Sequence, residues 1–210
     1  MKALQSSALI ATLALSILAA PGTALAASPF KKVSGGTLHV PSGVIFPRRV
    51  GVFQFVTTKV YGSGGRDAGA GYNAGSTIRG DLYVYPLGTY GKDFNAELRV
   101  QQNAITQLNK NVKLVSQSRV QLNQGGRNLS GMRVQYDLTR SLFGEKSHRC
   151  GSQLYLFRDG PWLIQGRFSY PIEQSGTANR QIADFLRLWQ WRAQGKIVQL
   201  HRTLRDGSRG

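Results

Sequence analysis

Cys150 and His148 are the residues whose types are best suited to nucleophilic catalysis. A catalytic cysteine attacks as the thiolate, so its pKa must be lowered by neighbouring positive charge, which His148 and Arg149 can supply. No asparagine or aspartate is placed in the sequence to orient the histidine. We therefore expect a lone, half-buried thiol at the start of a strand, either free or paired with a second chain. A thiol-dependent enzyme at Cys150 is the less favoured interpretation.

Motifs for metal, phosphate and hydrolytic chemistry are missing from the sequence. The three histidines, His39, His148 and His201, are far apart and show no HxxxH spacing. The glycine-rich stretch 62–76 matches neither GxGxxG nor a phosphate-binding loop, and we favour a flexible connector over an anion-binding nest around Arg66. The ten acidic residues mostly fall at caps, turns and connections. We expect no metal, no cofactor and no catalytic activity.

Basic and aromatic residues are the remaining chemical signal. The formal net charge is +17, which bears on partners and solubility and not on the fold. If they project from one face of a sheet, five residues can bind an anionic or sugar-like ligand by charge and stacking: Arg133, Arg158, Arg167, Tyr83 and Tyr85. The favoured alternative is that a helix covers this face and the arginine stems lie along apolar neighbours.

The two ends of the chain differ from its middle. Lys2, the uncharged apolar run 8–20 and Ala24-Leu25-Ala26 have the pattern of a secretory signal with cleavage near Ala26. We expect a signal peptide over 1–26, a single domain over 27–195 and a basic tail over 196–210. A retained amino-terminal anchor is the alternative for the first segment. Arg202 and Arg205 lie in the tail, which is suited to loose contact with an acidic surface.

Export limits the partners that the positive charge can meet. In the periplasm or outside the cell, the available anions are phospholipid head groups, lipopolysaccharide phosphates and acidic wall polymers. Nucleic acid is not expected there, and no later segment is apolar enough to cross a membrane. Cys150 is the only cysteine, so no intramolecular disulfide can form and the domain relies on packing alone.

The element that the other strands must join is a hairpin over 150–171. Asp159-Gly160 takes the positive φ of a tight turn between two apolar runs rich in aromatic residues. Alternation predicts further strands over 50–61, 77–86, 112–122 and 129–139, with a short edge strand over 37–40. Residues 62–76 contain six glycines and are expected to form a mobile loop that packs no core.

Two amphipathic helices are expected to cover the sheet. Asp93 is suited to cap the first, which carries an apolar stripe through about Asn109. That stripe consists of Phe94, Leu98, Ile105 and Leu108. Ser175 or Thr177 caps the second, which ends near Gly195. Its buried face consists of Ile182, Phe185, Leu186 and Trp189.

The predicted order is β-β-β-α-β-β-β-β-α, an α+β fold with an antiparallel sheet of about six to seven strands. A strand ending in LYVYP, a capped helix, two hairpins (GGRNLSGMRVQYDL and QLYLFRDGPWLIQGRFSYP) and a final amphipathic helix follow one another. Over about 38–193 this order resembles the PsbP-like α/β/α sandwich of the photosystem subunit PsbP, DcrB-type envelope proteins and a nuclear Ran-binding relative. The resemblance lies in element order, so no site residue is transferred.

The resemblance implies a non-enzymatic accessory domain that contacts other macromolecules. Together with the export signal, it leads us to expect an accessory or interaction domain of the bacterial cell envelope. The alternative is a binder of anionic envelope polymers or lipid head groups that uses a basic surface.

Overall fold

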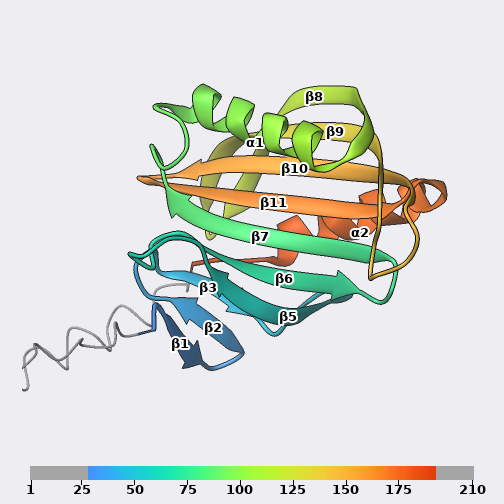
Figure 1. Cartoon of the computed structure of the whole chain (residues 1–210). Coiled ribbons are helices and arrows are strands. Elements are labelled where there is room, and N and C mark those ends of the chain that lie inside the picture. The colour runs from blue at the N-terminus through green and yellow to red at the C-terminus, as the bar shows by residue number, and fades with distance from the viewer. Residues whose placement is uncertain (1–27, 193–210) are drawn as a thin grey trace, which may run out of the picture.

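The computed structural model describes residues 28–192 as two antiparallel sheets and two α-helices (Figure 1). The smaller sheet, in the order β1-β2-β3, consists of β1 (Phe30–Val33), β2 (Gly36–His39) and β3 (Val44–Pro47). The larger sheet consists of β4 (Arg49–Val50), β5 (Phe53–Val60), β6 (Ala68–Ala74), β7 (Ile78–Pro86), β8 (Lys110–Gln124), β9 (Arg127–Arg140), β10 (His148–Asp159) and β11 (Trp162–Pro171). Its eight strands follow the order β4-β5-β6-β7-β11-β10-β9-β8. The predicted α+β class is confirmed, with more strands than expected.

The hairpin of β10 and β11 lies near the middle of the larger sheet, as predicted. Asp159 is opposite Trp162, and Gly160 takes a φ of 62° in the turn between them. β7 pairs with the other side of β11, and β9 with the other side of β10. Both hairpin strands are therefore flanked on each side, which explains their near-continuous burial.

The glycine-rich stretch was wrongly predicted to be a mobile loop throughout. β6 occupies its second half, pairs with β5 and β7, and buries Ala68, Ala70 and Tyr72. Small residues permit this placement because a Cβ at Gly69 would lie 2.6 Å from the backbone oxygen of Leu82. Glycine here allows a close approach of neighbouring backbone atoms inside a sheet.

Two further strand predictions need correction. The lead-in 28–49 contains all of the smaller sheet, where only one short strand was expected. The strand predicted over 50–61 is broken at Gly51, whose φ of 57° turns β4 back onto β5. Phe53 is fully buried whereas Val56 is 55% exposed, so the face with the valines is the solvated one.

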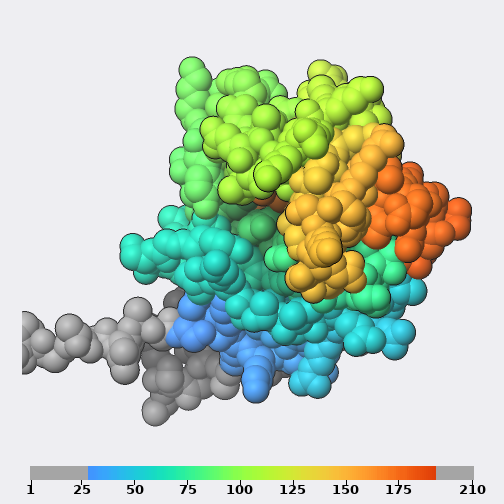
Figure 2. Space-filling model, turned by 45° about the vertical axis from the view of Figure 1, so that its right-hand side comes forward, coloured from blue at the N-terminus to red at the C-terminus, as the bar shows by residue number. Residues whose placement is uncertain are grey.

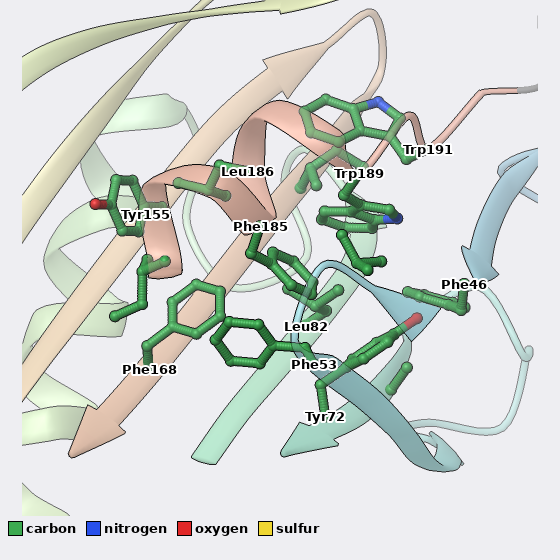
Figure 3. Packing of buried hydrophobic residues seen from close by; sticks show 14 of the residues in the cluster. Phe46, Phe53, Tyr72, Leu82, Tyr155, Phe168, Phe185, Leu186, Trp189 and Trp191 are labelled. Carbon is green, nitrogen blue, oxygen red and sulfur yellow. The ribbon is translucent and has the colours of Figure 1, made fainter. Parts of the chain in front are cut away.

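α1 (Phe94–Leu108) and α2 (Ser175–Leu188) pack with different hydrophobic clusters, formed by residues from opposite faces of the larger sheet. On the α2 face, aromatic side chains from strands, helix and smaller sheet fill the core (Figure 3). The side chains labelled there are Phe46, Phe53, Tyr72, Leu82, Tyr155, Phe168, Phe185, Leu186, Trp189 and Trp191. The arrangement is a sheet between two helical layers.

α1 begins as predicted, and its buried stripe differs from the prediction. The Asp93 carboxylate accepts a hydrogen bond from the amide of Ala96 at 2.8 Å, which caps the helix. Leu98 and Ile105 are buried, but Leu108 is 76% exposed. Glu97 and Gln101 are buried instead. The inner face of this helix is therefore partly polar.

α2 starts and ends at other residues than predicted. Gln174 precedes its first turn without a side-chain cap, and neither Ser175 nor Thr177 acts as one. The helix ends at Leu188, and just beyond that end the Nε2 of Gln124 donates to the carbonyl of Trp189 at 2.8 Å. Gly195, the predicted stop, lies outside the described residues. No helix within residues 28–192 is long and apolar enough to span a membrane.

Candidate functional site

Three of the predicted site residues meet in a pocket on the α1 face of the larger sheet. Tyr83 and Tyr85 point there from β7, and Arg167 points there from β11. We call this cavity of about 210 Å³ the tyrosine pocket. It is lined by Tyr61, Asp67, Tyr83, Tyr85, Tyr90, Val100, Gln101, Ala104, Gln165 and Arg167. Figure 2 shows the surface hollowed between α1 and the turn that joins β5 to β6.

Arg167 is the cation of the tyrosine pocket. Its Nη2 donates to the side-chain oxygen of Gln101 at 2.7 Å, and its guanidinium lies 5.8 Å from the ring centre of Tyr83. No carboxylate among the described residues lies within ion-pairing distance of it, and its buried Nε has no hydrogen-bond partner. This arginine therefore has unused capacity to bind an anionic group.

The pocket's tyrosines are held in place by their neighbours. The ring centres of Tyr61 and Tyr83 are 5.6 Å apart, and Gly69 makes room for both because a Cβ there would lie 3.2 and 3.3 Å from the two rings. The hydroxyl of Tyr85 donates to Gln165 at 2.9 Å. Burial raises the pKa of Tyr83 and Tyr85 far above the usual phenol range. Both phenols are therefore neutral hydrogen-bonding groups.

Asp67 is the acid of the pocket. Its Oδ2 accepts a hydrogen bond from the hydroxyl of Tyr90, and its buried Oδ1 has no partner. Burial raises the pKa of Asp67, and the Glu97 carboxylate raises it further, against the effect of the Tyr90 hydrogen bond. Glu97 in turn accepts from the backbone amides of Gly88 and Tyr90 at 3.1 and 3.0 Å, which fixes the loop that carries Tyr90.

Arg158 lies in a second, larger cavity on the same face. We call it the basic groove; its volume is about 720 Å³. It is lined by Phe94, Asn95, Arg119, Val120, Gln121, Ser130, Gly131, Met132 and Arg158. These residues include two arginines and no acid, and the Nε of Arg158 donates to the Gly160 carbonyl at 3.1 Å. The groove can therefore accept negative charge.

Arg133 does not share a face with Arg158 and Arg167, contrary to the one-face arrangement considered above. It is paired across the ladder with Tyr155, on the α2 face, and its guanidinium lies 5.8 Å from that ring. Its Nε donates to Gln153 at 3.2 Å and its Nη2 reaches Asn179 of α2 at 3.5 Å. Arg133 is thus partly covered by a helix, with its polar atoms engaged. Arg202 and Arg205 lie outside the described residues.

Several pocket and groove residues were missed by the sequence analysis. Asp67 was assigned to a mobile loop, and Tyr90 was not singled out. Gln101 interrupts the apolar stripe of α1 one turn after Glu97, and that interruption was the available signal for a polar inner face. Alternation along β8 does not show which face Arg119 occupies. The face follows from the pairing of Arg119 with Met132 on β9, which also lines the groove.

Cys150 does not have the surroundings of a reactive thiol. It is fully buried, and its sulfur contacts the carbonyl oxygens of Arg140 and His148 at 3.8 and 3.5 Å. Burial raises the pKa of the Cys150 thiol, against the favourable charge of Arg140. The imidazole Nδ1 of His148 is engaged with the Lys146 carbonyl at 3.1 Å. Across residues 28–192, no three histidine, cysteine or acidic side chains converge on a point where a metal could bind.

Comparisons with known proteins reveal likeness at the level of the fold. No protein-family model and no curated protein sequence matches this chain. Cyanobacterial PsbP (CyanoP) from Synechocystis sp. PCC 6803 is 11% identical over 70% of this chain and 86% of its own, with a TM-score of 0.44. PA94, a protein of unknown function from Pseudomonas aeruginosa, is 10% identical over 75% and 94%, with a TM-score of 0.40. A PsbP protein is thus among the similar structures, in agreement with the resemblance noted in the sequence.

Proposed function

We propose that this protein is an exported, non-enzymatic interaction domain of the bacterial cell envelope that binds an anionic polymer in the basic groove. The observation that carries the proposal is that Arg119 and Arg158 both line a groove whose lining residues include no acid. Opposite charge would have to come from outside the chain, because no described carboxylate forms an ion pair with either arginine. The net charge of +17 favours approach of a polyanion from a distance.

The size of the groove is sufficient for a short segment of a polymeric ligand. Its volume of about 720 Å³ lies within the range of about 300–1,000 Å³ typical of ligand sites. Phe94 and Met132 provide apolar walls on which the stem of a bound chain can lie, beside the two guanidinium groups. The signal-like pattern of residues 1–26 supports delivery to the compartment where acidic envelope polymers occur.

Binding of linear polyphosphate to the purified protein tests this proposal. The double variant Arg119→Gln/Arg158→Gln should bind at least tenfold more weakly and lose about two units of salt slope, because two phosphate contacts are removed. The matched control is Arg180→Gln/Arg187→Gln, which removes the same charge from the exposed side of α2. It should retain most of the affinity.

Two results would overturn the proposal. Equal losses in both double variants would show that overall charge, and not the groove, determines binding. Groove-dependent binding to phosphatidylglycerol vesicles without binding to polyphosphate would identify a lipid surface as the partner in place of a polymer.

A further inference from the structure

We infer that the tyrosine pocket is a second, separate binding site that takes a small zwitterion of the α-amino-acid class, with the carboxylate on Arg167 and the ammonium on Asp67. The pocket and the basic groove have no lining residue in common. The inference goes beyond the proposed function, because a ligand of this size and charge differs from a polymeric anion.

The charges of the pocket are the first argument. Arg167 and Asp67 line one cavity, yet they form no ion pair with each other. Each has a buried polar atom without a hydrogen-bond partner in the chain, the guanidinium Nε and the carboxylate Oδ1. Such atoms are rare in folded proteins. A ligand that carries one positive and one negative group can pair with both side chains.

The direction in which the ligand lies follows from the aromatic contacts. The Arg167 guanidinium lies 5.8 Å from the centre of the Tyr83 ring. A second cation at this ring is disfavoured because it would be repelled by the guanidinium. The Asp67 end offers a carboxylate and the Tyr90 hydroxyl, which together suit an ammonium group. The negative end of a ligand is therefore placed toward Arg167 and the positive end toward Asp67.

The size of the pocket limits the ligand. A cavity of about 210 Å³ corresponds to the bulk volume of about seven water molecules. It is smaller than the sites that hold drug-sized molecules, and it suits a molecule of a few heavy atoms more than a polymer segment. Val100 and Ala104 of α1 add an apolar strip along one wall, which can contact a short aliphatic side chain.

Tyr90 stands at the entrance to the pocket. It is 47% exposed, and Glu97 holds its loop through the amides of Gly88 and Tyr90. Rotation of the Tyr90 side chain would break its hydrogen bond to Asp67 and free the Oδ2 of that carboxylate for a ligand. Movement of one exposed side chain is therefore sufficient to release this oxygen.

Calorimetric titration of the intact protein with each standard L-amino acid tests the ligand class. For an amino acid that binds, we expect its amide, which lacks the carboxylate, and its N-acetyl form, which lacks the ammonium, to bind at least tenfold more weakly. The inference fails if no amino acid binds, if the amide and N-acetyl forms bind equally well, or if glucose binds as tightly. The last result would identify a neutral sugar site.

Charge-removing variants test the location of the site. In Arg167→Gln the ratio of affinities for the amino acid and its amide should fall to about one, while discrimination against the N-acetyl form remains. Asp67→Asn should have the reverse effect. These ratios are taken within one variant, so a change in its stability does not imitate them. Arg158→Gln, in the basic groove, should alter neither ratio, and a loss of discrimination there would overturn the assignment.

Discussion

The two faces of the larger sheet treat buried charge in opposite ways. On the α2 face, the buried carboxylate of Asp159 accepts hydrogen bonds from Arg127 at 2.9 Å, Trp191 at 3.0 Å and Arg192 at 2.6 Å. On the α1 face, Asp67, Glu97 and Arg167 each keep a buried atom without a partner. One face completes its hydrogen bonds within the chain, and the other leaves them open.

The contrast extends to every such atom in residues 28–192. The buried side-chain atoms that lack a partner belong to the α1 side, on Asp67, Glu97, Tyr136, Arg140, His148 and Arg167. The packing of aromatic residues also differs between the two faces. Rings on the α2 face pack against one another, as Phe53 and Phe185 do at 4.9 Å between centres, whereas those near Arg167 surround a cavity. The α2 face is thus closed by contacts within the chain, whereas the α1 face keeps buried polar atoms without partners beside a cavity.

The largest expected effect comes from removing the Asp159 carboxylate, which accepts hydrogen bonds from three side chains. Asp159→Ala should lower the free energy of unfolding by about 3 kcal/mol, because the buried indole of Trp191 loses its acceptor and two arginines lose their partner. Urea unfolding measures this change. Asp159→Asn, which keeps one acceptor, should lose less.

Asp67→Ala is the matched variant on the other face. It removes a carboxylate that has only one partner in the chain, so we expect a loss below about 1 kcal/mol. Equal losses for Asp159→Ala and Asp67→Ala would remove the distinction between the two faces.

A smaller effect is expected from adding a methyl group at Gly69, beside the rings of Tyr61 and Tyr83. Gly69→Ala places a Cβ 2.6 Å from the Leu82 carbonyl oxygen and against two tyrosine rings, so it should lower the free energy of unfolding by about 2 kcal/mol. Gly71→Ala provides the control on the same strand, because its Cβ would meet nothing closer than 3.8 Å.

Gly69 and Gly71 lie on the same face of β6, so the pair of variants separates the close approach at Gly69 from the general effect of glycine in this strand. Gly71→Ala should be neutral or slightly stabilising, since alanine reduces the freedom of the unfolded chain. If urea unfolding finds both variants equally destabilised, the loss is a general property of glycine in this strand and the close approach at Gly69 is not its cause.

The sequence allowed the elements with strong local signals to be predicted. The Asp159-Gly160 turn and the Asp93 cap depend on neighbouring residues alone, and both are found where expected. β6 was missed because glycine and alanine carry no strand signal, and its position is determined by the strands on either side. The smaller sheet was missed for a similar reason, since its four-residue strands lie among glycines and prolines.

The candidate sites were predicted only in part. Tyr83, Tyr85 and Arg167 were grouped on the condition that they share a face, and these three do line one pocket. Alternation within one strand does not fix the register between strands, and for this reason Arg133 was grouped with the wrong face. Asp67 and Tyr90 come from loops whose conformation depends on tertiary contacts such as the hydrogen bonds to Glu97, which leave no local pattern in the sequence.

The smallest expected effect is a pH dependence that has opposite signs at His39 and Asp67, because burial favours the neutral form of both a base and an acid. Burial lowers the pKa of His39, which packs near Trp162 on the α2 side, against a raising effect from its hydrogen bond to the Gly65 carbonyl. The unfolded chain then takes up the proton first, below its ordinary pKa of 6.5. Stability from His39 is therefore present above pH 6.5 and is lost as the pH falls toward the folded pKa.

Asp67 changes the stability of the fold with pH in the opposite direction. Its raised pKa means that the folded chain keeps a proton that the unfolded chain has released above 3.8. Stability from Asp67 is present below pH 3.8 and is lost as the pH rises through the folded pKa. For either residue the slope is at most about 1.4 kcal/mol per pH unit, since one proton is involved.

Urea unfolding of the wild type, His39→Gln and Asp67→Asn over a series of pH values separates the two slopes. The stability difference between wild type and His39→Gln should shrink as the pH falls below 6.5, because only the wild type loses the contribution of the neutral imidazole. The stability of the wild type relative to Asp67→Asn should fall as the pH rises from 3.8, because only the wild type carries the titrating carboxyl group. If both differences changed in the same direction with pH, burial would not favour the neutral form of both side chains, and one of the two pKa directions would be wrong.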